Sequence, residues 1–139
     1  MSIQKIEESF VRNFVRKERR ERALSTLRSK KPQKRTYLLD KMNHSWTELL
    51  LEKYLQKIES KSDQDVMKEV KARLGLSNKD LCYIISYDQN DGKMLDFETA
   101  FAKCQSIGYA GLIIGPEGDR FYLKTEQVKG APNKFIGLR

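Results

Sequence analysis

The stretch that decides the fold reads Leu81-Cys-Tyr-Ile-Ile-Ser-Tyr87 and continues as Asp88-Gln-Asn-Asp-Gly92. Its first seven residues are rich in β-branched and aromatic side chains, which favour a strand, and the five residues after them are turn formers. We therefore predict a strand at residues 81–87 that ends in a turn.

The same stretch also admits a helical interpretation. Residues 70–84 resemble the helix-turn-helix motif of DNA-binding proteins, because a glycine turn at Gly75 and a polar cap at Ser77 lie between apolar positions. The resemblance implies sequence-specific DNA reading by a second helix. It departs at Lys71, where the motif usually has a small residue, and the second helix would carry no arginine. Both interpretations stay open on the sequence, and the strand is favoured.

Residues 88–126 extend this strand into a strand-helix-hairpin unit. Asp96 is expected to cap a helix whose apolar positions keep helical spacing up to Gly108. The near-continuous apolar run at residues 109–114 predicts a buried strand, and the alternation at residues 120–124 predicts a half-exposed return strand.

The first 41 residues predict a basic helix. Apolar residues recur at helical spacing from near residue 3, and Pro32 ends the helix. Between them, residues 16–22 contain only Arg, Lys and Glu. Such a run is compatible with a helix but cannot be buried on any face, so we expect it to project from the body.

Three further helices are predicted before residue 76. A short one follows Pro32 around residues 37–42. The spacing of Ser45 and Glu48 is that of a capping box, which predicts a helix running to about residue 60. Ser62 then opens a helix that stops at Gly75.

The predicted fold class is α+β in a single domain over residues 1–139. A basic helical extension (1–41) and a helical layer (42–75), with about four helices between them, precede an α+β unit (76–126) and an irregular tail (127–139). The unit forms a small three-stranded sheet. Because three strands make a thin sheet, its apolar face needs helices against one side.

The positive charge is concentrated at one end of the sequence. The 139 residues carry a net charge of +8. Residues 1–41 hold thirteen Lys and Arg against five Asp and Glu, an excess of eight, so the remaining residues balance. A localised basic segment favours a polyanionic partner.

We therefore expect a small cytoplasmic binding protein that contacts a polyanion, with nucleic acid bound without sequence specificity as the first candidate. The segment lacks the interleaved amide and aromatic side chains of base readout. A protein-interaction module, such as an adaptor or an inhibitor of an acidic partner, is the alternative, and an ordinary solvated helical face is the simplest interpretation. The predicted polyanion-binding residues are Arg12, Arg16, Lys17, Arg19, Arg20, Arg22, Lys30, Lys31, Lys34 and Arg35.

No catalytic, cofactor-binding or metal-binding residues are predicted. His44 is the only histidine, and Cys82 and Cys104 are too far apart for a CxxC motif, which favours buried free thiols. No phosphate-loop spacing occurs, and Asp88–Gly92 places glycine one position too early for a calcium loop. No cofactor and no enzymatic activity are expected, although an enzyme site built from scattered carboxylates stays a minor alternative. No apolar run reaches the ~18 residues of a membrane span, and no secretory signal is evident.

Overall fold

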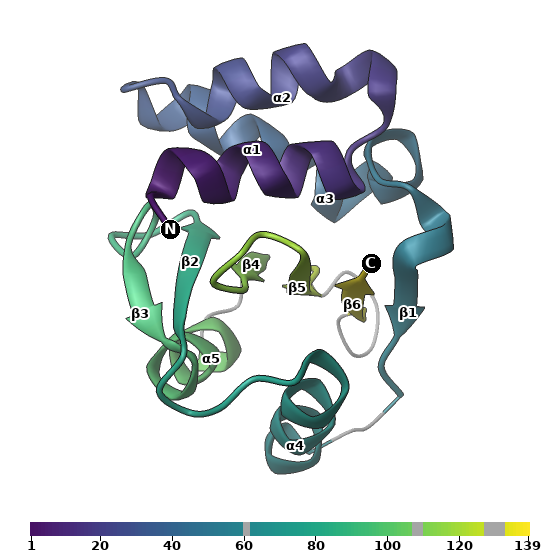
Figure 1. Ribbon diagram of the computed structural model, residues 1–139, viewed down its shortest axis with the longest axis vertical. Helices are drawn as coiled ribbons and strands as arrows, with labels where there is room; N and C mark the ends of the chain where they lie inside the picture. The colour runs from purple at the N-terminus through teal and green to yellow at the C-terminus, as the bar shows by residue number, and fades with distance from the viewer. Residues whose placement is uncertain (60–61, 107–109, 127–132) are drawn as a thin grey trace.

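The computed structural model describes residues 1–59, 62–106, 110–126 and 133–139. These residues form five α-helices and one six-stranded antiparallel sheet with the strand order β1-β6-β5-β4-β2-β3 (Figure 1). The helices are α1 (Ile3–Phe14), α2 (Arg20–Leu27), α3 (Pro32–Leu49), α4 (Asp63–Leu74) and α5 (Phe97–Ser106), with short 3-10 turns at Lys17–Arg19 and Glu52–Tyr54. The strands are β1 (Leu55–Lys57), β2 (Leu81–Ser86), β3 (Met94–Asp96), β4 (Gly111–Ile114), β5 (Arg120–Lys124) and β6 (Lys134–Leu138).

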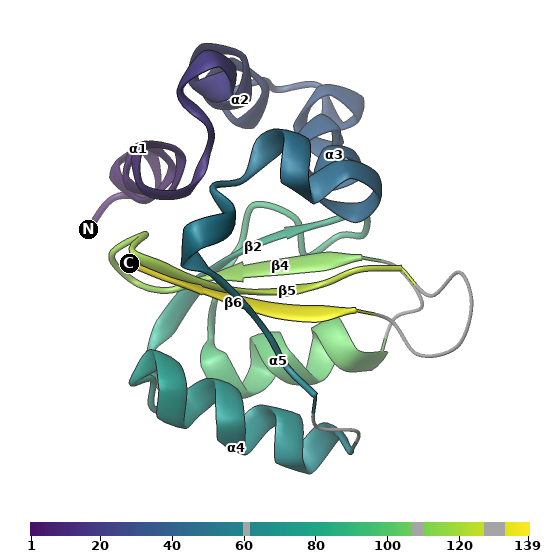
Figure 2. The same ribbon diagram turned by 90° about the vertical axis from the view of Figure 1, so that its right-hand side faces the viewer.

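The sheet lies between two helical layers. Helices α1 to α3 cover one face, and α4 and α5 cover the other (Figure 2). Successive side chains of a strand point to opposite faces, so each central strand feeds both cores. In β2, for example, Tyr83 and Ile85 join the core under α1 to α3, while Cys82 and Ile84 join the core against α4 and α5.

Several sequence predictions are confirmed. The decisive stretch is a strand, β2, so the helix-turn-helix interpretation is wrong. Ser62 caps α4 by accepting a hydrogen bond from the Asp65 N–H at 3.1 Å, and Gly75 ends that helix in the left-handed conformation. Asp96 caps α5 in the same way through the Thr99 N–H at 2.9 Å. Residues 107–109, where the end of α5 and the start of the next strand were expected, lie outside the described residues.

The prediction of a three-stranded sheet covered on one side is wrong. The sheet has six strands and is covered on both faces. Burial on both faces also corrects the expectation of a half-exposed β5, because Tyr122 and Lys124 are buried. The Lys124 ammonium donates to the Cys104 carbonyl at 2.6 Å, which satisfies the charged end of the side chain inside the protein.

The helix predicted from Ser45 to about residue 60 is also wrong. Ser45 interrupts α3 with non-helical backbone angles, and the helix ends at Leu49. Leu50 then forms a bridge with Val15, and the Leu51 N–H donates to the Phe14 carbonyl at 2.8 Å. This pairing holds the chain extended, and residues 55–57 continue as edge strand β1.

The tail contains a strand where irregular structure was expected. Residues 134–138 form β6, which pairs with β5 on one side and β1 on the other. Phe135 and Ile136 point into the two opposite cores. The first part of the predicted tail, residues 127–132, lies outside the described residues.

Candidate anion-binding surface

The basic segment is two helices, not the single projecting helix that was predicted. Helix α1 ends at Phe14 and packs across the sheet with Ile6, Phe10 and Phe14 buried. The chain turns at residues 15–19, and α2 lies beside α1 and α3. The apolar stripe stops at Arg16, so no packing would hold one long helix to the sheet beyond that point.

Two predicted cations stabilise this turn. The Arg20 guanidinium donates from Nε to the Val15 carbonyl at 3.0 Å, just past the C-terminus of α1, where a positive charge is favourable. Arg16 donates from Nε to the Thr47 carbonyl at 2.8 Å and lies 3.7 Å from Glu52. Both side chains therefore already have partners within the protein.

Arg35 is enclosed in a polar network between the helical layer and the sheet. Its guanidinium donates to both Asp91 carboxylate oxygens, at 2.8 and 3.3 Å, and to the Tyr83 hydroxyl at 2.9 Å. It also contacts the Leu27 carbonyl and lies 3.6 Å from Glu7. Burial alone would lower the pKa of Arg35, but the hydrogen bonds that its guanidinium donates to Asp91 and Tyr83 outweigh this effect and raise the pKa, so the charge is held inside the fold.

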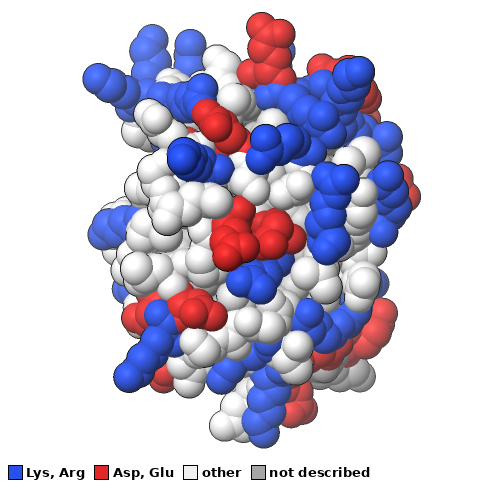
Figure 3. Space-filling view, viewed as in Figure 1, with Lys and Arg blue, Asp and Glu red and all other residues white. Residues whose placement is uncertain are grey.

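The other seven predicted cations lie outward on the α1–α3 layer. Arg19 is half-buried and the other six are exposed, and none of the seven is paired with a carboxylate in the part of the chain that the structure describes. Figure 3 shows Lys and Arg side chains gathered over α2, with a few carboxylates among them. We call this set the basic surface: Arg12, Lys17, Arg19, Arg22, Lys30, Lys31 and Lys34.

Part of the basic surface is hollowed into a groove between α2 and the start of α3. It has a volume of about 700 Å³, and none of the described residues that line it carries a carboxylate. The Arg22 guanidinium of α2 lies over the Tyr37 ring of α3, 4.7 Å from its centroid. Lys34, also in α3, lines the same groove. The lining residues are Arg22, Ser25, Thr26, Arg28, Ser29, Gln33, Lys34 and Tyr37.

The polar groups of this groove are mainly hydrogen-bond donors. The Ser29 oxygen accepts the Lys31 N–H at 3.1 Å, which leaves the Ser29 hydroxyl hydrogen to donate. Arg28 is paired with Glu8, whereas Arg22 and Lys34 have no carboxylate partner among the described residues. A groove of cations, hydroxyls and an amide is suited to an acceptor-rich anion such as a phosphate group.

Sequence reasoning found Arg22 and Lys34 but missed the rest of the groove. A signal was present, because Arg22, Ser25, Thr26 and Ser29 follow the spacing of one helix face. Tyr37 falls at the start of the short helix predicted around residues 37–42, and no role beyond that helix was predicted for it, yet the Arg22 guanidinium lies over its ring. Its role depends on how α2 folds back on α3, which periodicity does not describe.

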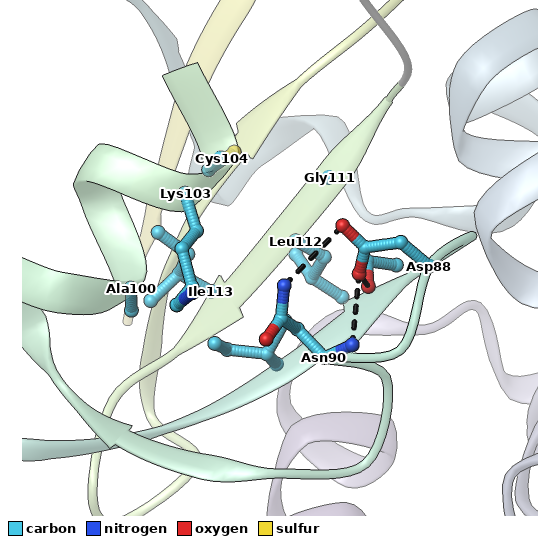
Figure 4. A pocket seen from close by; sticks show the side chains of 10 residues that line it. Asp88, Asn90, Ala100, Lys103, Cys104, Gly111, Leu112 and Ile113 are labelled. Carbon is cyan, nitrogen blue, oxygen red and sulfur yellow. Dashed lines mark hydrogen bonds between the residues drawn. The ribbon is translucent and has the colours of Figure 1, made fainter. Parts of the chain in front are cut away.

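Two other hollows are less suited to binding an anion, one because of its charges and the other because of its size. A groove of about 600 Å³ beside α5 is lined by Asp96 and Glu98 as well as by Lys79 and Lys103, so its charges balance. A cavity between α5 and the sheet, lined by Asp88, Asn90, Lys103 and Cys104 among others, has a volume of about 10 Å³, roughly that of one water molecule (Figure 4).

Two groups that line this cavity have shifted pKa values. Burial raises the pKa of the Cys104 thiol to about 12, so the thiol stays protonated and unreactive. Burial alone would also raise the pKa of Asp88, but hydrogen bonds from Ser86 and Asn90 outweigh it, and the pKa lies below its ordinary value. Cys82 and Cys104 are both buried free thiols, as predicted.

Among the described residues, no three His, Cys, Asp or Glu side chains gather as a metal site would require. No helix there is long and apolar enough to cross a membrane. Comparison of the chain with protein-family profiles, with curated proteins and with solved structures gave no match.

Proposed function

We propose that this protein binds nucleic acid without sequence specificity through the basic surface and the α2–α3 groove. One observation carries the proposal: within the described part of the chain, the seven cations of the basic surface have no carboxylate partner, and no carboxylate lines the groove. Cations paired with carboxylates would already be neutralised, whereas unpaired ones gain from contact with phosphates.

The affinity of such a surface comes from the release of counterions. Each phosphate that a Lys or Arg neutralises frees condensed cations into solution, so the observed affinity falls steeply as salt rises. Helix α2 is poorly suited to base reading, because it contains no Asn or Gln to pair with adenine. Its two arginines are already engaged within the protein, Arg20 with the Val15 carbonyl and Arg22 with the Tyr37 ring. The proposed contact is therefore with the backbone of the nucleic acid.

The test is fluorescence anisotropy with a labelled oligonucleotide of mixed sequence, in a buffer of ~0.1 M salt for all variants and also at lower salt for the wild-type protein. The variant Arg22→Glu with Lys34→Glu reverses two groove charges. The control, Lys68→Glu with Lys79→Glu, makes the same change in net charge at two exposed lysines outside the basic surface. We expect the groove variant to lose at least about tenfold in affinity and the control to lose less than about threefold, since a buffer of ~0.1 M salt screens charges beyond roughly 10 Å.

Competition with poly-glutamate separates this proposal from a protein partner. It presents negative charge without phosphate, so we expect it to displace the oligonucleotide only weakly. Equal competition by poly-glutamate would favour an acidic protein partner over nucleic acid. Absence of oligonucleotide binding at low salt, or equal losses in the two double variants, would overturn the proposal.

A further inference from the structure

We infer that the α2–α3 groove binds single-stranded nucleic acid in preference to duplex, with a nucleobase against the Arg22–Tyr37 stack and the adjoining phosphate at Lys34. The inference rests on the proposed function and goes beyond it, because unspecific charge attraction alone does not select a strand with free bases. Three features of the groove support it.

The first feature is the Arg22–Tyr37 cation–π contact. The Arg22 guanidinium lies over the Tyr37 ring at 4.7 Å, and this cation–π contact holds a long side chain that would otherwise move freely. Guanidinium planes and aromatic rings are the surfaces on which proteins stack unpaired bases. A duplex keeps its bases paired and stacked inside, so it cannot use this surface.

The second feature is the placement of cations around the stack. Arg28, at the end of α2, is paired with Glu8, whereas Lys34, in the first turn of α3, has no carboxylate partner in the ranges that the structure describes. The Ser29 hydroxyl keeps its hydrogen for donation. A phosphate beside a stacked base would meet a charge from Lys34 and donors from Arg28 and Ser29, just after α2.

The third feature is size. Ligand pockets typically have volumes of about 300–1,000 Å³, and the groove, at about 700 Å³, falls in that range. It is therefore large enough for a base with its sugar and phosphate. The mixed-charge groove beside α5 is of similar size but carries two carboxylates, which would repel a phosphate.

The experiment compares anisotropy titrations with a labelled single strand of about 15 nucleotides and a duplex of the same length and sequence, at one ionic strength. We expect the wild-type protein to bind the single strand about tenfold more tightly. Arg22→Lys keeps the charge and removes the planar group, so it is expected to lower single-strand affinity about five- to tenfold and to change duplex affinity less than twofold.

Tyr37 provides the second variant and its control. Tyr37→Leu removes the ring and is expected to lose the preference in the same way, whereas Tyr37→Phe keeps the ring and the preference. Circular dichroism and thermal unfolding check that each variant is folded. If Tyr37→Leu does not fold, Arg22→Lys decides alone.

The outcomes separate this inference from the proposed function. Equal binding of single strand and duplex, with affinity lost in the Arg22→Glu, Lys34→Glu variant, would overturn the strand preference and leave the proposed function standing. A preference that Arg22→Lys leaves unchanged would also overturn the inference. Absence of binding to either form would overturn both.

Discussion

At the scale of single residues, Glu7 and Arg35 show how the basic layer is fixed to the sheet. Glu7 is 3% exposed, accepts the Tyr83 hydroxyl at 2.8 Å and lies 3.6 Å from the Arg35 guanidinium. Arg35 in turn holds Asp91 in the turn after β2. This network joins α1, α3 and the sheet, so its members act inside the fold and are not available to a ligand.

Glu7 gives a prediction for the pH dependence of stability. Burial raises the pKa of Glu7 above its ordinary value of 4.5, although Tyr83 and Arg35 partly offset the effect. A carboxyl group whose pKa is higher in the folded than in the unfolded state adds to the free energy of unfolding. This stabilisation is fully present below the pKa of the unfolded state and is lost as the pH rises through the pKa of the folded state. The free energy of unfolding should therefore fall as pH rises from about 4.5.

Glu7→Gln tests this directly. Urea unfolding between pH 4.5 and pH 7 should show a decrease in stability for the wild-type protein and a smaller decrease for the variant, because glutamine does not ionise. The two profiles should meet toward pH 4.5 and separate above it. Parallel profiles across the range would contradict the assignment of the raised pKa to Glu7.

Gly118 is the residue where α1 meets the sheet most closely. It has a positive φ of 74°, and a Cβ there would lie 2.7 Å from the Ile6 carbonyl oxygen. Gly118→Ala should therefore destabilise the protein by about 2–3 kcal/mol, through both backbone strain and displacement of α1. Chemical denaturation measures this free energy.

Gly75→Ala is the matched control. Gly75 also has a positive φ, of 63°, but a Cβ there would meet its nearest atom at 3.8 Å, which is ordinary contact. Only the cost of the left-handed conformation remains, about 1–2 kcal/mol. If the two variants were equally destabilised, the close approach of α1 to Gly118 would not matter.

At the scale of elements, α1 is held by one aromatic cluster. The Phe14 ring packs edge-on against Phe121, with 4.8 Å between centroids, and also contacts Phe10 and Tyr54. Phe14→Ala should cost about 3–5 kcal/mol in unfolding free energy, whereas Ile3→Ala on the same helix should cost less than about 1 kcal/mol because Ile3 is exposed. Similar losses from both would show that α1 is not fixed by its buried stripe.

Elements with strong local signals were predictable from the sequence. The β-branched run at residues 81–86, and the caps Ser62 and Asp96, specified β2, α4 and α5 correctly. These signals are local, because each depends on side chains within a few positions of the element.

Elements that depend on distant partners were not predictable. β1 is only three residues long, follows a leucine-rich run typical of a helix, and is extended because β6 pairs with it. In β6, Gly137 weakens the strand signal, yet a Cβ there would lie 2.0 Å from the Phe121 ring, so the missing side chain makes room for that ring.

The candidate site was predictable in composition and not in shape. Charge counting placed the cations in the first 41 residues. It could not separate Arg35, which is enclosed by Asp91 and Tyr83, from Lys34 beside it, which lines the groove. Arg35 and Lys34 lie on different sides of α3, and the turn after β2 brings Asp91 to the side of Arg35.

At the scale of the whole molecule, the protein has two different faces. The α1–α3 layer carries the excess positive charge, while the chain after residue 41 is neutral in sum. The sheet separates the two helical layers, so the excess positive charge lies on one side of the molecule. A polyanion would be attracted to that side first.

The most direct test of the central claim is the salt dependence of oligonucleotide binding. For single strands, each neutralised phosphate contributes roughly 0.7 to the slope of log K against log salt concentration. We predict a steep slope for the wild-type protein, a slope shallower by about 1.4 for Arg22→Glu with Lys34→Glu, because two phosphate contacts are lost, and an unchanged slope for Lys68→Glu with Lys79→Glu. A wild-type affinity that does not change with salt, or the same slope in all three proteins, would contradict the account.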